Sequence, residues 1–119
     1  MSKGRQAALD RMRHMISAAD AIARYVARGR AAFDDDSAIR EAIVYQIAVI
    51  GEAAKAVVNA DPELANDSPG VEWSLLAKMR DKVTHHYWAV DREIVWATAT
   101  KDVPGIRILL AGVLAGGDQ

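Results

Sequence analysis

Five residues that could act on a phosphodiester bond lie close together in the chain: Arg80, Asp81, His85, His86 and Tyr87. Arginine is permanently charged and binds phosphate oxygens through two parallel hydrogen bonds. Histidine is the side chain best suited to move protons near neutral pH. An arginine and a histidine are together sufficient to cleave RNA without a metal ion.

In this interpretation, Arg80 holds the scissile phosphate and stabilises the charge that develops on it. His85 acts as general base on the ribose 2′-hydroxyl, or as general acid toward the leaving 5′-oxygen. Asp81 precedes His85 by four residues, so a helix places both on one face, where the carboxylate would orient the imidazole and raise its basicity. Because RNA supplies its own nucleophile, DNA would not be a substrate.

The spacing of Arg80 and His85 sets a geometric condition. Five residues of an ideal helix turn through about 500°, so the two side chains point about 140° apart. They would meet one ligand only if the helix ends or distorts around Thr84 and His85, or if a second subunit completes the site.

The residue types alone leave two alternatives open. Charged residues are common on helices, so Arg80 could pair with Asp81 or Glu52 while the histidines lie on an ordinary exposed surface. Zinc at Asp81, His85 and His86 is less favoured, because adjacent histidines diverge on a helix and no fourth ligand is evident. We therefore expect no metal and no cofactor.

Apolar residues recur every three or four positions, which is the period of an amphipathic helix. The two clearest apolar stripes are Leu9, Met12, Ile16, Ala19, Ile22 and Val26 in the first predicted helix, and Ile39, Ile43, Ile47, Ile50, Ala54 and Val57 in the second. The pattern predicts helices over about residues 5–28 and 37–59, a third from Glu72 or Trp73, a fourth after the capping residue Asp91, and a last one from Pro104. Gly29 is expected to stop the first helix, Asp34–Ser37 to cap the second, and residues 60–72 to form a loop with room for one short helical turn. The predicted fold class is all-α, a helical bundle with mostly short loops.

Gly51 lies inside the second predicted helix, whose apolar face is wide enough to make this helix central. Glycine in a helix costs about 1 kcal/mol relative to alanine. Close approach of another backbone would offset that cost, so we expect a neighbouring element to contact Gly51.

Composition and charge narrow the class of protein. A length of 119 residues fits a single domain spanning 1–119, and the absence of cysteine excludes disulfides and thiolate metal sites. No apolar run approaches the roughly 18 residues of a membrane span, so we expect a cytoplasmic protein that does not bind membranes. Residues 1–30 carry a net charge of +5 and the rest −6. The basic first helix would attract a polyanion, or it is an ordinary solvated helix face.

The segment from Arg80 to Tyr87 resembles the ribonuclease motif of the HEPN superfamily, which has an arginine, a polar residue and, after four to six intervening positions, a histidine. The Tyr87 position resembles the HepT branch, whose motif continues to a tyrosine two residues beyond the histidine. His86 fills a free position. The similarity continues through Ile50–Lys55, which looks like the second-helix signature of that branch, and covers about residues 37–110.

The resemblance implies a HEPN-like bundle of four to five helices and a homodimeric endoribonuclease toxin with Arg80 and His85 as catalytic residues and Asp81 in support. It also implies a cognate antitoxin of the MntA type, a minimal nucleotidyltransferase that neutralises the toxin by transferring AMP to Tyr87. Otherwise Tyr87 is an amphipathic aromatic packed at a helix end. The alternatives to an enzyme are a non-catalytic HEPN module that docks a nucleotidyltransferase, and a structural bundle that oligomerises through alanine-rich faces.

Overall fold

The chain folds into helices throughout the part that the computed structural model describes, which is residues 2–68, 70–85 and 91–117, with residues 82–85 and 117 described by their backbone alone. The helices are α1 (Lys3–Val26), α2 (Arg30–Asp35), α3 (Ser37–Ala60), α4 (Pro62–Asn66), α5 (Trp73–His85), α6 (Arg92–Ala97) and α7 (Val103–Gly117). A π-helical segment, η2 (Thr98–Asp102), joins α6 to α7, so the backbone stays helical from 92 to 117. The described residues contain no strand, which confirms the all-α prediction.

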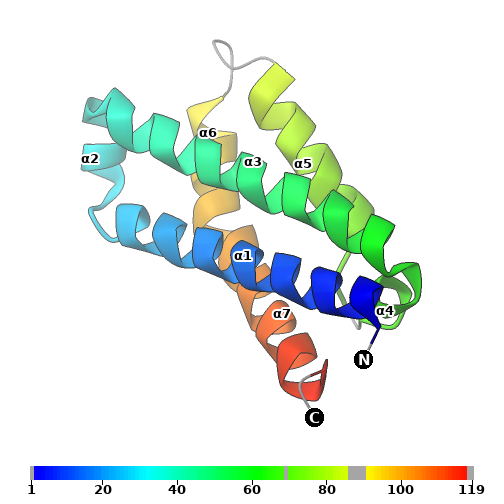
Figure 1. The fold of residues 1–119 in the computed structure, drawn as a ribbon. Coiled ribbons are helices and arrows are strands. Elements are labelled where there is room, and N and C mark those ends of the chain that lie inside the picture. Colours follow the sequence, from blue (N-terminus) through cyan, green and yellow to red (C-terminus); the bar gives the residue numbers. More distant parts are fainter. Residues whose placement is uncertain (1, 69, 86–90, 118–119) are drawn as a thin grey trace.

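The two most extensive helix pairings, α1 with α3 and α3 with α5, place α3 in the middle of the bundle. Figure 1 shows α1 and α3 side by side and antiparallel, with α5 packed on the other side of α3. The continuous run from α6 to α7 crosses behind them, and α7 packs against α1. This arrangement puts the Arg80 end of α5 directly beside the central helix.

The core is made by the apolar stripes that the periodicity predicts. All six stripe residues of α3 are buried: Ile39, Ile43, Ile47, Ile50, Ala54 and Val57. In α1, the predicted residues Leu9, Met12, Ala19 and Ile22 are buried, while Ile16 and Val26 are partly buried against the core. Each large apolar side chain removed from water contributes about 1.5–3 kcal/mol, so these two stripes dominate the packing of the bundle.

Aspartates start several of the helices. Asp36 caps α3 by accepting a hydrogen bond from the Ala38 backbone N–H at 2.9 Å, and Asp91 caps α6 by accepting one from Glu93 at 2.7 Å. Both caps were expected from the sequence, because an aspartate oxygen satisfies a backbone N–H that has no partner inside the helix.

One helix escapes the sequence prediction. Residues 30–35 form α2, so Asp34 lies inside a helix and pairs with Arg30, and only Asp36 of the acidic cluster is a cap. The first helix ends at Val26, and Gly29 adopts a φ of +92° in the turn that follows. A six-residue helix has too few turns to produce a periodic apolar pattern, and it is held here by burial of Phe33.

Two ion pairs hold distant elements together. Arg30 of α2 donates hydrogen bonds to both carboxylate oxygens of Glu93 on α6, at 3.1 and 2.5 Å, which lowers the pKa of Glu93. Arg107 of α7 donates to Asp20 of α1 at 2.7 Å and lowers the pKa of that carboxyl.

Within the described ranges, no helix has the length and apolar character that crossing a membrane requires.

Candidate functional site

Helix α5 carries most of the predicted site. Arg80 and Asp81 lie in its last two turns, and His85 is its final residue. Arg80, Asp81 and the backbone of His85 therefore belong to one described helix, and the end or distortion expected around Thr84 and His85 falls at the border of the described residues and stays a prediction. The side chain of His85 and all of His86 and Tyr87 lie outside the described residues, so their roles stay predictions.

The start of α5 is anchored by one buried tryptophan. The indole N–H of Trp73 donates a hydrogen bond to the Ala65 carbonyl of α4 at 2.9 Å, and Trp73 is almost fully buried. One turn further on, Leu76 is also buried in the core. These two residues fix the rotation of α5, which leaves Arg80 at the surface.

Gly51 lets α5 approach α3 closely at Arg80. A Cβ atom at position 51 would lie 2.9 Å from the Leu76 carbonyl oxygen and would overlap the Cβ of Arg80. Neither atom belongs to a flexible side-chain end, so a larger residue would push the two helices apart. The expectation that another backbone contacts Gly51 is thus confirmed, and the contact is with the helix that carries the site.

Four charged residues from α3 and α5 form the local electrostatic environment. The Arg80 guanidinium donates to the Asp81 carboxylate at 3.0 Å and lies 3.4 Å from Glu52, while the Lys55 ammonium is 3.9 Å from Asp81. The alternative in which Arg80 pairs with Asp81 or Glu52 therefore describes real contacts. They do not exclude phosphate binding, because the Arg80 side chain is 36% exposed and Glu52 is 65% exposed. Exposed ion pairs of this kind contribute about 0–1 kcal/mol, so a phosphate can replace them at low cost.

Sequence reasoning did not foresee the part played by Lys55. Its contact with Asp81 depends on how α3 and α5 cross, which local spacing does not specify. One signal in the sequence could have indicated this contact. Glu52 and Lys55 lie within four residues of Gly51, and a glycine inside a helix predicts that another element comes close to the residues beside it.

The alternative of a zinc ion bound by Asp81, His85 and His86 involves residues outside the described side chains. No cluster of three or more potential metal ligands occurs among the described side chains, but two of the three candidates, His85 and His86, are not included in them.

An all-α bundle in which Arg80 and His85 lie five residues apart on one helix matches the HEPN class. The model of the family described as "Ribonuclease HepT-like" matches residues 15–112, so the chain belongs to the HepT-like family. This confirms the resemblance seen in the sequence.

Three curated relatives support the same assignment. A Methanocaldococcus jannaschii protein named "Putative RNase" is 36% identical over 72 residues, which is 60% of this chain and 57% of that protein. "Probable ribonuclease HepT" from Thermococcus cleftensis is 33% identical over 72 residues, covering 60% and 63% of the two chains. A Caldanaerobacter subterraneus protein, also named "Putative RNase", is 36% identical over 72 residues, covering 60% and 62%. The matched segment thus spans about three fifths of each relative. No solved structure gave a significant match to this chain.

Proposed function

We propose that this chain is a metal-independent endoribonuclease that cleaves RNA by using the ribose 2′-hydroxyl. The observation that carries the proposal is the partly exposed guanidinium of Arg80, held on the helix that also contains His85 by the close contact of α5 with Gly51. Family membership and the names of the relatives support the same activity.

The chemistry follows from the two residue types. The 2′-oxygen attacks the adjacent phosphorus as it loses its proton to a general base, the bond from phosphorus to the 5′-oxygen breaks, and the leaving oxygen takes a proton from a general acid. The products are a 2′,3′-cyclic phosphate and a 5′-hydroxyl. Arg80 stabilises the charge on the non-bridging oxygens, and His85 serves as base or acid. Asp81, four residues before His85 on α5, is the supporting carboxylate.

The enzyme acts as a homodimer in this proposal. An ideal helix would point Arg80 and His85 in divergent directions, and two copies overcome this if they turn both pairs toward one cleft, so that one histidine is the base and its mate the acid. A surface suited to such contact lies between α5 and the run from α6 to α7, where a groove of about 900 Å³ is lined by Leu75, Ile94, Ile108 and Leu109.

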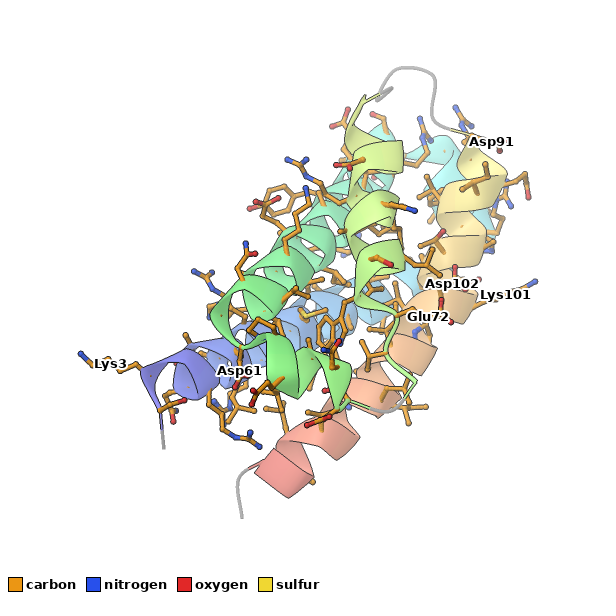
Figure 2. All side chains as sticks on the ribbon, turned by 90° about the vertical axis from the view of Figure 1, so that its right-hand side faces the viewer. Lys3, Asp61, Glu72, Asp91, Lys101 and Asp102 are labelled. Atoms are coloured by element: carbon orange, nitrogen blue, oxygen red, sulfur yellow. The ribbon has the colours of Figure 1, made fainter. Side chains whose placement is uncertain are left out.

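The rim of this groove favours a second copy of the chain as its occupant. Two acids, Glu72 and Asp102, and two bases, Lys78 and Lys101, are among its lining residues, so a two-fold contact can place each acid opposite a base of the other copy. Figure 2 labels Glu72, just before α5, and Asp102 on the side of the molecule that carries the groove, with Lys101 extending into solvent.

We further propose that the enzyme is the toxin of a toxin–antitoxin pair, and that an MntA-like nucleotidyltransferase neutralises it by AMP transfer to Tyr87. The Tyr87 oxygen would attack the α-phosphorus of ATP and release pyrophosphate. Tyr87 is two residues beyond His85, so the added anion would compete for Arg80 and repel the RNA backbone. Peptide mass spectrometry after incubation with the partner and ATP should find the adenylyl group on Tyr87, and its presence elsewhere would contradict this mechanism.

The function is tested by expressing the protein with and without the nucleotidyltransferase and comparing growth and RNA integrity. Expression alone should slow growth and fragment RNA, and co-expression should restore both. His85→Ala, at matched expression, should be harmless in either setting. Full toxicity of that variant would refute the assignment of the site.

A further inference from the structure

A cationic hollow between α1 and α3 adjoins the Arg80 cluster. It has a volume of about 410 Å³, and its polar lining residues are Arg11 and His14 of α1 with Glu52, Lys55 and Asn59 of α3, beside the apolar residues Val49, Ala53 and Ala56. Glu52 and Lys55 belong to both places, because they also contact Arg80 and Asp81 at 3.4 and 3.9 Å. The hollow and the proposed cleavage site are therefore parts of one continuous surface.

The donors around the hollow are arranged on neighbouring turns. Arg11 and His14 are three residues apart and share a face of α1. Lys55 and Asn59 are four residues apart and share a face of α3. Their positions are separated by about 6 Å along the helix axis. Two helices thus present cationic and N–H donor groups to the same space, as the binding of a phosphate requires.

The side chains that α1 contributes to this hollow are available to a ligand. Arg11 and His14 are exposed, and within the described residues neither makes a hydrogen bond or ion pair through its side chain. The acid in the lining, Glu52, has its carboxylate beside the Arg80 guanidinium, which offsets its repulsion of an anion. Arg13, by contrast, is paired with Asp10 at 2.8 Å.

We propose that this hollow is a phosphate subsite for RNA, formed by Arg11, His14, Lys55 and Asn59, which holds a phosphate next to the one bound at Arg80. The inference rests on the proposed ribonuclease function and adds to it a path for the strand, from the end of α5 across α3 to α1. A strand with its scissile phosphate at Arg80 carries further phosphates at regular short intervals, and those on one side pass over this hollow. The subsite contributes affinity without base specificity.

Binding and cleavage test this inference separately. A fluorescent single-stranded DNA 12-mer is the binding probe, because it offers the same phosphates and has no 2′-hydroxyl to react. Arg11→Gln should weaken its binding about 5- to 10-fold near 0.1 M salt and lower the salt slope of log K by about 0.7, the value for one phosphate contact. Arg11→Lys should keep most of the affinity, since it keeps the charge.

The matched control is Arg24→Gln, which removes an exposed cation from the same helix away from the hollow. It should change binding less than twofold. An equal loss in both variants would overturn the subsite in favour of diffuse attraction to a basic helix, and wild-type affinity in Arg11→Gln would overturn it outright. A loss confined to binding of the nucleotidyltransferase would assign the hollow to a protein partner instead.

Cleavage then separates the subsite from the ribonuclease proposal. In Arg11→Gln, KM for an RNA 12-mer should rise about 5- to 10-fold with little change in kcat, while the effect on a dinucleotide should be much smaller. Wild-type protein that binds the 12-mer but cleaves no RNA would refute the ribonuclease function alone. If the wild-type protein cleaves RNA and the Arg11→Gln variant has the wild-type KM for the 12-mer as well as for the dinucleotide, the subsite alone is refuted.

Discussion

Arg80 makes exposed contacts with Asp81 and Glu52, which suits a residue that must exchange these contacts for a phosphate. Its contacts with Asp81 and Glu52 are exposed and worth about 0–1 kcal/mol each. A charge-assisted bidentate bond to phosphate is roughly twice as strong as a neutral hydrogen bond. The ion pairs therefore position the guanidinium without preventing its use.

Arg80→Gln should lower kcat/KM for RNA by about 10²–10³, because it removes the main donor to the developing charge. Its Tm should stay near that of the wild-type protein, since changes at exposed positions are usually within about 0.5 kcal/mol. Steady-state cleavage and thermal unfolding measure the two effects. Arg28→Gln, an exposed cation beyond the end of α1, is the control and should cleave normally. Undiminished cleavage by the Arg80 variant would exclude its catalytic role.

The residue types of the site and the partners of Arg80 could be predicted from the sequence, but the contact made by Lys55 could not. The spacing from Arg80 to His85 identifies the motif, and Glu52 was a foreseeable partner. The contact between Lys55 and Asp81 depends on the crossing of two helices, which residue spacing does not determine.

At the scale of elements, the close contact of α3 and α5 at Gly51 connects the fold to the site. Gly51→Ala would gain up to about 1 kcal/mol of helix propensity but would overpack the interface at a typical cost of 1–3 kcal/mol. We expect net destabilisation and reduced cleavage, because α5 must move together with Arg80. Chemical denaturation and activity assays measure both.

The control for Gly51→Ala is Gly112→Ala in α7, where an added Cβ would have no neighbour within 4 Å. That change should stabilise the protein by up to about 1 kcal/mol. If both alanine variants were more stable than the wild-type protein, the close contact at Gly51 would not exist as described.

The ion pair between Arg30 and Glu93 is a clamp between α2 and α6, and it should make the free energy of unfolding depend on pH. Arg30 lowers the pKa of Glu93, so the clamp stabilises the folded state above the ordinary carboxyl pKa of 4.5 and loses this contribution as pH falls through the lowered value. Glu93→Gln should therefore reduce Tm at pH 7, with the difference closing below about pH 4.5. Glu41→Gln, an exposed acid on α3, should leave Tm unchanged. A difference for Glu93→Gln that is constant with pH would contradict the clamp.

The elements themselves were largely predictable. The stripes of α1 and α3 and the caps at Asp36 and Asp91 follow from periodicity and capping chemistry. Helix α2 was missed because its stability comes from the burial of Phe33 and the reach of Arg30 to Glu93, 63 residues away. Contacts of that separation leave no local pattern.

At the scale of the whole molecule, the groove beside α5 gathers most of the exposed large apolar side chains of the described residues. Among the described residues, six large apolar side chains are exposed, and four of them line this groove. Large exposed apolar patches mark interaction sites. Ile108→Glu should shift the dimer toward monomer in light scattering and reduce cleavage, because the 71% exposed Ile108 is the most exposed of the four.

The matched control is Tyr45→Glu, which places the same charge at an exposed aromatic residue outside the groove. It should leave the oligomeric state unchanged. A fully active monomer at micromolar concentration would contradict the proposal that two copies complete the site.

The central claim is tested most directly by the chemical nature of the RNA ends formed by the purified protein in EDTA. Mass spectrometry should find 2′,3′-cyclic phosphate, or the 3′-phosphate formed when it opens, together with 5′-hydroxyl ends, and none of these products with His85→Ala. Cleavage that stops in EDTA and returns with magnesium, with the RNA fold controlled, or that leaves 3′-hydroxyl ends, would contradict the account.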